Sequence, residues 1–163
     1  MSATATKPTV SLVISVWNRK DDLRDNLRAI AAQTVRADQV IVVDNASKDG
    51  TPEMVLAEFP WVQLIRMPHS QYGACETFNV GFASARGEFT GILDDDVVLP
   101  PTFVEHMLAK FAQEPATTAI LSPKVIEPEM PDWYLKSEAI HRERYLPTFR
   151  GCGSMARSDA IKK

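Results

Sequence analysis

Three consecutive carboxylates, Asp94, Asp95 and Asp96, follow the apolar stretch Phe89–Leu93 of this 163-residue chain. They place negative charge at the point where a buried strand should end. Two like charges about 4 Å apart repel by roughly 4 kcal/mol at an effective dielectric constant of about 20. Hard divalent cations such as Mg²⁺ and Mn²⁺ bind carboxylate oxygens and remove this repulsion. The triplet therefore predicts a metal site, and an acidic turn before a helix is the alternative interpretation.

Further polar residues follow the neighbouring apolar runs. Asp44 ends the run Val40–Val43, and Asn18 and Arg19 follow the run Val10–Val16. In an open parallel sheet, ligands bind outside the carboxyl ends of the strands. We therefore expect these residues and the acidic triplet to converge on one cleft, and this convergence favours a metal site over an acidic turn.

The elements that must position these residues alternate between strand and helix. Short apolar runs predict strands, and apolar residues at helical spacing predict helices. The strands are expected at Val10–Val16, Val40–Val43, Val62–Ile65, Phe89–Leu93 and Ala119–Leu121, and the helices at Asp21–Gln33, from Pro52 with Thr51 as its cap, at Tyr72–Ala85 and at Pro101–Phe111. A last strand and a helix capped by Ser158 are expected near the end of the chain. This order predicts an α/β domain whose mainly parallel sheet has helices on both faces.

Composition limits the classes of partner. The chain is 45% hydrophobic and 24% charged, with a net charge of -3 and a pI of about 5.6. It therefore shows no basic footprint for nucleic acid. Two cysteines without metal-type spacing indicate a reduced, cytoplasmic protein. No apolar run is long enough to span a bilayer, and association with the inner face of a membrane through other segments stays open.

The loop after the first strand, SVWNRKDD, contains no glycine. It thus lacks both the dinucleotide fingerprint and the P-loop, which depend on glycines to approach phosphates closely. It offers Ser15, Trp17 and Asn18, which suit a nucleobase better than a pyrophosphate.

Three segments, SLVISVWNR, IVVDNASKDGT and FNVGFASARGEFTGILDDDVVLPP, together resemble the family 2 glycosyltransferases. The resemblance covers about residues 10–111 and extends weakly to GCGSMARSDAI. It implies a GT-A fold and inverting transfer of a sugar from a UDP- or dTDP-sugar to an acceptor hydroxyl, with Mn²⁺ or Mg²⁺ as cofactor. We expect one domain over residues 1–163, with a donor-binding half at about 10–122 and a flap with the start of an acceptor half at about 123–163.

The resemblance also implies roles for single residues in the nucleotide part of the site. Ser15 and Trp17 would line the base pocket, with Asn18 beside them. Asp44 would accept a hydrogen bond from the imide of uracil or thymine. The remaining nucleotide-sugar contacts would come from Asn45 and Ser47 in the loop after Asp44, and from Asn79.

Within the triplet, the resemblance makes Asp94 and Asp96 the two acids of a DxD motif. Asp94 would lie near the ribose or the metal ion, and Asp96 would bind the metal ion. Because three acids are adjacent, the register is open, and Asp95 is a further candidate for either role. The chain departs from the family pattern where Phe78, rather than Arg, precedes Asn79.

The general base of this family, an Asp or Glu, is expected beyond Lys163, so we expect the chain to bind the donor and to be catalytically incomplete. The implied acceptor is a carbohydrate or a lipid-linked acceptor of cell-wall or polysaccharide synthesis. Two alternatives stay open. One is a non-catalytic interaction module with the same fold. The other is a sugar-nucleotidyltransferase, which the glycine-free first loop disfavours.

Overall fold

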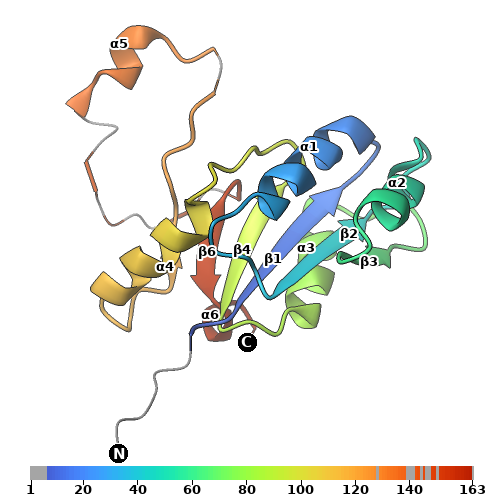
Figure 1. Cartoon of the computed structure of the whole chain (residues 1–163), viewed down its shortest axis with the longest axis horizontal. Helices are drawn as coiled ribbons and strands as arrows, with labels where there is room; N and C mark the ends of the chain where they lie inside the picture. The colour runs from blue at the N-terminus through green and yellow to red at the C-terminus, as the bar shows by residue number, and fades with distance from the viewer. Residues whose placement is uncertain are drawn as a thin grey trace, which may run out of the picture.

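The computed structural model describes residues 7–127, 129–138, 142–143, 145, 148–149 and 151–162. Its centre is a six-stranded sheet in the order β3-β2-β1-β4-β6-β5 (Figure 1). The strands are β1 (Val10–Val16), β2 (Gln39–Asp44), β3 (Gln63–Arg66), β4 (Phe89–Asp94), β5 (Ile120–Leu121) and β6 (Ser154–Arg157). Each strand lies at the place that the apolar runs predict.

The sheet is parallel over its first four strands and antiparallel at one side. β1 pairs in parallel with both β2 and β4, and β3 continues the parallel order beyond β2. β6 runs antiparallel to β4, and β5 runs antiparallel to β6. The prediction of a mainly parallel sheet is therefore confirmed.

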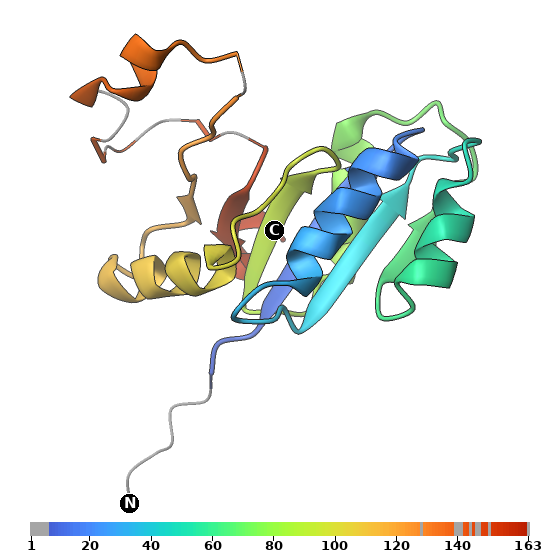
Figure 2. The same cartoon turned by 45° about the horizontal axis from the view of Figure 1, so that its top comes forward.

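Helices cover both faces of the sheet. The helices in the described part of the chain are α1 (Lys20–Ala31), α2 (Thr51–Glu58), α3 (Ala74–Ser84), α4 (Phe103–Gln113), α5 (Asp132–Leu135) and α6 (Ser158–Ile161). The short helix α5 lies apart from the sheet (Figure 1). The side chains of Leu12 and Ile14 pack in one core with those of α1, α2 and α4, whereas Val13 packs in a second core beside α3. Figure 2 shows α1 and α2 in front of the sheet and α3 behind it. This two-sided burial explains the continuous apolar runs of the central strands.

Two predicted helix caps are wrong. Gly50, with a φ of 87°, precedes α2, so Thr51 is the first helical residue, and its hydroxyl donates to Asp49 Oδ1 at 2.6 Å. Ser158 is likewise the first residue of α6 and not its cap. Its hydroxyl donates to the carbonyl oxygen of Gly87 at 2.6 Å, which fixes α6 to the start of β4. The Thr51 hydroxyl is thus used in a local bond within the turn before α2, and the Ser158 hydroxyl in a long-range bond, so neither caps its helix.

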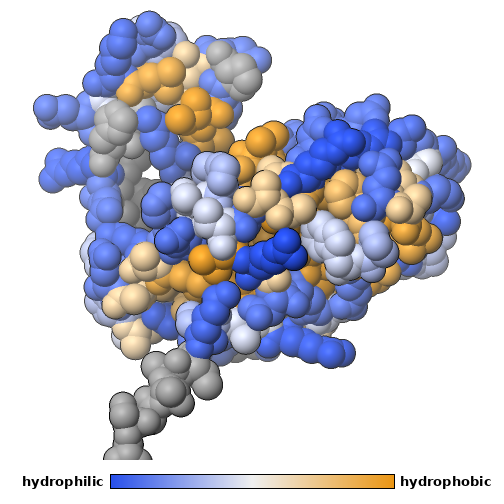
Figure 3. Space-filling model, in the orientation of Figure 1, coloured by the Kyte–Doolittle hydropathy of each residue, from blue (hydrophilic) through white to orange (hydrophobic). Residues whose placement is uncertain are grey.

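The segment between β5 and β6 extends away from the sheet and contains the short helix α5, which the sequence did not predict (Figure 1). The flap expected from residue 123 onward is described only in part. Figure 3 shows hydrophobic side chains gathered on this segment, and Trp133 of α5 is 73% exposed. In the part of the chain that the structure describes, no helix is long and apolar enough to cross a membrane.

Candidate active site

The predicted convergence at the carboxyl edge of the sheet is confirmed by the strand register. Val16 of β1 pairs with Asp44 at the end of β2. Ser15 pairs with Asp94 at the end of β4 on the other side. The two acidic strand ends therefore flank the end of β1, and the loop that follows β1 lies between them.

Asp44 is fully buried, and its charge is compensated. Both carboxylate oxygens accept from the backbone N–H of Ser47 at 3.2 Å. The guanidinium Nε of Arg66 lies 3.5 Å from Asp44 Oδ2, and its Nη2 donates to the carbonyl oxygen of Ser47 at 3.2 Å. Arg66 is not among the predicted site residues, although its place at the end of the third strand is a signal of the same kind as that of Asp44.

The loops after β1 and β2 hold each other. The backbone N–H of Asn18 donates to Ser47 Oγ at 2.9 Å, and Asn18 Oδ1 accepts from the N–H of Lys48 at 2.7 Å. Asn18 adopts a left-handed φ of 52° in this arrangement. Trp17 next to it is 56% exposed. Asn18 and Ser47 thus fix the loops, and the ring of Trp17 is left accessible to a ligand.

Two more predicted residues contact the chain at the start of α3. The hydroxyls of Ser15 and Thr77 lie 2.6 Å apart, and Asn45 Nδ2 donates to the carbonyl oxygen of Tyr72 at 2.7 Å. Asn45 Oδ1 is buried without a partner among the described residues. Asn79 is different, because it lies exposed on α3 and no interaction within the described part of the chain joins it to the other predicted residues.

The acidic triplet carries charge that is only partly compensated. Asp95 is 9% exposed, and burial raises the pKa of its carboxyl to about 6; nearby Arg19 opposes the shift, and repulsion from Asp96 adds to it. Burial, followed by repulsion from Asp96, also raises the pKa of Asp94. Arg19 Nη1 lies 2.8 Å from Asp96 Oδ2. The sequence placed Arg19 at this edge without assigning it a partner.

The donor set fits a metal ion that is shared with a ligand. Among the described residues, no group of three or more His, Cys, Asp or Glu side chains is arranged to hold a metal ion alone. Mg²⁺ in phosphate-handling sites is held by one or two carboxylates, and phosphates and water complete its coordination. Adjacent, mutually repelling carboxylates meet that requirement, so Asp94 and Asp96 are suitable ligands for such an ion.

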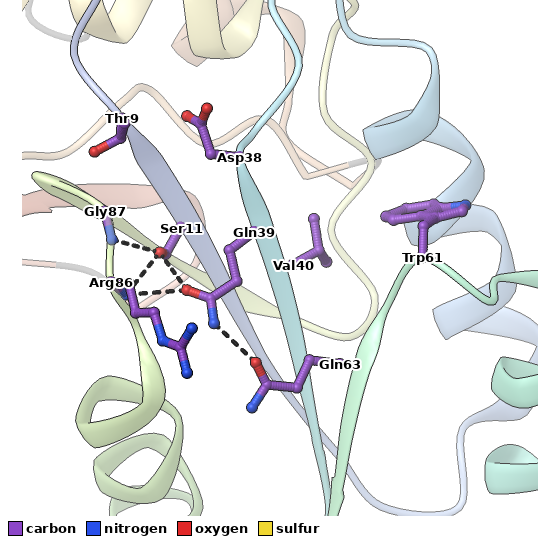
Figure 4. A pocket seen from close by; sticks show the side chains of 9 residues that line it. All are labelled: Thr9, Ser11, Asp38, Gln39, Val40, Trp61, Gln63, Arg86 and Gly87. Carbon is purple, nitrogen blue, oxygen red and sulfur yellow. Dashed lines mark hydrogen bonds between the residues drawn. The ribbon is translucent and has the colours of Figure 1, made fainter.

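A hollow of about 420 Å³ lies at the opposite, amino-terminal edge of the sheet (Figure 4). Its polar side chains bond to each other and to backbone groups around the hollow. Ser11 Oγ donates to Gln39 Oε1 at 2.8 Å, and Gln39 Nε2 donates to Gln63 Oε1 at 2.8 Å. None of the predicted site residues lines this hollow, so it is separate from the carboxyl-edge site.

Comparison with known proteins gives one consistent result. The family Glycosyl transferase family 2 matches residues 11–159. An uncharacterized glycosyltransferase of Haemophilus influenzae is 32% identical over 118 residues, which are 72% of this chain and 40% of that protein. The chain therefore spans about two fifths of the length of this relative.

Two solved structures share the fold. The mannosyltransferase PcManGT from Pyrobaculum calidifontis, in complex with GDP-Man and Mn²⁺, superposes with a TM-score of 0.74 at 24% identity, over 94% of this chain and 45% of that one. S. aureus TarS in complex with UDP-GlcNAc superposes with a TM-score of 0.72 at 19% identity, over 94% of this chain and 46% of that one. At these identities the likeness shows the fold alone.

Proposed function

The chain belongs to glycosyl transferase family 2, and we propose that its carboxyl edge binds a nucleoside-diphosphate sugar, as the donor site of a metal-dependent inverting glycosyltransferase. One observation carries this proposal: Asp44 and Asp94 flank the end of β1 in the sheet register. A single donor lying across the end of β1 would lie next to both strand ends. Solved relatives of this fold contain GDP-Man or UDP-GlcNAc, which supports the same class of ligand here.

Asp44 is the proposed base-recognising residue. A carboxylate accepts hydrogen bonds and donates none, and the guanidinium Nε of Arg66 lies 3.5 Å from Asp44 Oδ2. Asp44 therefore suits a base that presents a ring N–H, as uracil and thymine do, and it disfavours cytosine, whose ring nitrogen is an acceptor. The exposed ring of Trp17 offers a stacking surface for that base.

Asp94 and Asp96 are the proposed metal ligands, with Asp95 as the third candidate. A bound Mn²⁺ or Mg²⁺ would neutralise the charge that develops on the leaving diphosphate. In the proposed reaction the acceptor hydroxyl oxygen forms a bond to the anomeric carbon. The bond from that carbon to the diphosphate breaks, and its electron pair leaves with the phosphate oxygen. The hydroxyl proton passes to a general base, and the acceptor is a carbohydrate or a lipid-linked group of polysaccharide or cell-wall synthesis.

Calorimetry of this chain with UDP, dTDP, GDP and CDP, each with and without Mn²⁺, tests the proposal. We expect UDP and dTDP to bind more tightly with Mn²⁺, and CDP to bind more weakly than either. Asp96→Ala should lose the Mn²⁺ dependence, whereas Asp159→Ala, at an exposed acid on α6, should retain it.

The outcomes separate the open alternatives. If no nucleotide binds and Asp96→Ala behaves like the parent chain, the result favours a non-catalytic interaction module. If GDP binds more tightly than UDP, the donor site stands and the assignment to uridine or deoxythymidine donors is wrong.

A further inference from the structure

Asn26 is a polar residue on the buried face of α1. It is fully buried, as are Leu23 and Leu27 of the same helix. Its Nδ2 donates to the carbonyl oxygen of Val97 at 2.6 Å and to that of Asp94 at 3.3 Å. These two carbonyls lie at the two ends of the turn that carries the acidic triplet.

We propose that Asn26 is a positioning residue, which holds this turn in the shape that lets the triplet bind a metal ion. The inference rests on the proposed donor site. Two carbonyl oxygens can be met only by the amide nitrogen, so the orientation of the amide is fixed. Asn26 Oδ1 is then left buried without a partner among the described residues, and such a group is costly for stability. The unpartnered Oδ1 of Asn26 therefore lowers the stability of the folded chain, while its Nδ2 anchors the turn.

The turn needs an anchor because its own bonds are weak. The backbone N–H of Val97 approaches the carbonyl oxygen of Asp94 only to 3.5 Å. Repulsion among the three carboxylates acts to open the turn until a cation is present. The hydrogen bond from Asn26 Nδ2 to the carbonyl oxygen of Val97, at 2.6 Å, is much shorter than the bond within the turn. The side chain from α1 therefore makes the stronger hydrogen bond to the turn. Arg19, which precedes α1, pairs with Asp96, so the same helix also positions charge next to the triplet.

Gln33, two residues after the last residue of α1, offers a matched control. It is 5% exposed, its Nε2 donates to the carbonyl oxygen of Pro100 at 2.8 Å, and its Oε1 accepts from the N–H of Val104 at 3.1 Å. Its Nε2 also donates to the carbonyl oxygen of Ala29 in α1 at 3.2 Å, so it joins the end of this helix to the chain beyond the triplet through a buried amide.

The test compares Asn26→Leu with Gln33→Leu. Thermal unfolding should show that both variants are less stable than the parent chain, because each leaves buried backbone groups unpaired. Mn²⁺ affinity in the presence of UDP, measured by electron paramagnetic resonance of the free ion, should separate them. Loss of a group that orients metal ligands weakens metal binding by about 10- to 100-fold. We expect such a loss for Asn26→Leu and less than about a twofold change for Gln33→Leu.

Asn26→Ser keeps a small hydrogen-bond donor that cannot reach both carbonyl oxygens. This variant replaces Asn26→Leu in the test if the leucine variant does not fold. It should weaken Mn²⁺ binding to an intermediate degree while circular dichroism stays that of the parent chain. The inference is overturned if folded Asn26 variants bind Mn²⁺ as Gln33→Leu does. If the parent chain itself binds no Mn²⁺ in the presence of UDP, the proposed donor site is wrong, and so is the proposed role of Asn26.

Discussion

Replacing Arg19 by glutamine should strengthen the binding of Mn²⁺ to the nucleotide-free chain. Arg19 Nη1 lies 2.8 Å from Asp96 Oδ2, and both side chains are about half exposed, at 50% and 52%. A cation that binds Asp96 must break this ion pair. Exposed ion pairs contribute about 0.2–1 kcal/mol, which corresponds to a factor of about 1.4 to 5 in the dissociation constant. Removal of one positive charge from the site acts in the same direction.

Titration of Mn²⁺ into the two chains at low ionic strength measures this effect. Arg28→Gln is the matched control, because Arg28 lies on α1, the helix that follows Arg19, and pairs with Asp25 at 3.4 Å, where it has no contact with the triplet. The difference between Arg19→Gln and the parent chain should shrink at about 1 M salt, where the Debye length is about 3 Å. Thermal unfolding should be nearly unchanged in both variants, since both pairs are exposed.

The reasoning is refuted if Arg19→Gln binds Mn²⁺ no more tightly than Arg28→Gln does. A weaker affinity for Mn²⁺ in Arg19→Gln would contradict it more directly, because the guanidinium would then support the metal site and not compete for it. Nucleotide adds an independent check. Once the cation displaces it, Arg19 is free to contact the diphosphate, so UDP with saturating Mn²⁺ should bind more weakly to Arg19→Gln than to the parent chain.

Three other predictions follow from single contacts. Asp44→Asn replaces one acceptor oxygen by a donor NH₂ group. It should weaken UDP binding about tenfold or more, as measured by calorimetry, because it removes a hydrogen bond to a charged group. An unchanged affinity for UDP would show that Asp44 does not contact the base. Gly81→Ala would place a Cβ 2.2 Å from Val13 Cγ1 and should lower the free energy of unfolding by about 1–3 kcal/mol in urea, whereas Gly151→Ala, with nothing within 4 Å, should not. The pKa of Asp95 is raised from 3.8 to about 6 by burial, so the folded chain binds this proton more tightly than the unfolded chain and stability should fall as the pH rises through this range. Asp95→Asn should flatten that fall, and a slope that it leaves unchanged would exclude Asp95 as the source.

The parts of the fold that the sequence predicts are those governed by neighbours in the chain. Val10–Val16 is mostly apolar and Val40–Val43 entirely so, because both faces of the central strands are buried. The place of Asp44 and Asp94 then follows from the rule that parallel strands end at one edge. Both features depend only on local pattern and on topology, so no side-chain detail was needed.

The parts that it does not predict depend on contacts between distant residues. Ser158 has the residue type of a cap, yet its hydroxyl bonds to Gly87, 71 positions earlier. Arg19 and Asp96 are 77 positions apart, and Asn26 and Val97 are 71 positions apart. A side chain on a helix gives no signal of which loop it will meet, so these partners appear only when the elements are packed together.

The two acidic strand ends differ in how their charge is met, and this difference supports separate roles. At the end of β2, the single carboxylate of Asp44 has a backbone N–H donor and a guanidinium beside it. At the end of β4, three carboxylates share one contacting guanidinium, and the pKa values of Asp94 and Asp95 are raised. A compensated carboxylate suits a neutral hydrogen-bonding group such as a base, whereas an uncompensated cluster favours a cation. The distribution of charge at this edge therefore supports base recognition by Asp44 and metal binding by the triplet, because one guanidinium faces a single carboxylate at the end of β2, whereas one guanidinium faces three carboxylates at the end of β4.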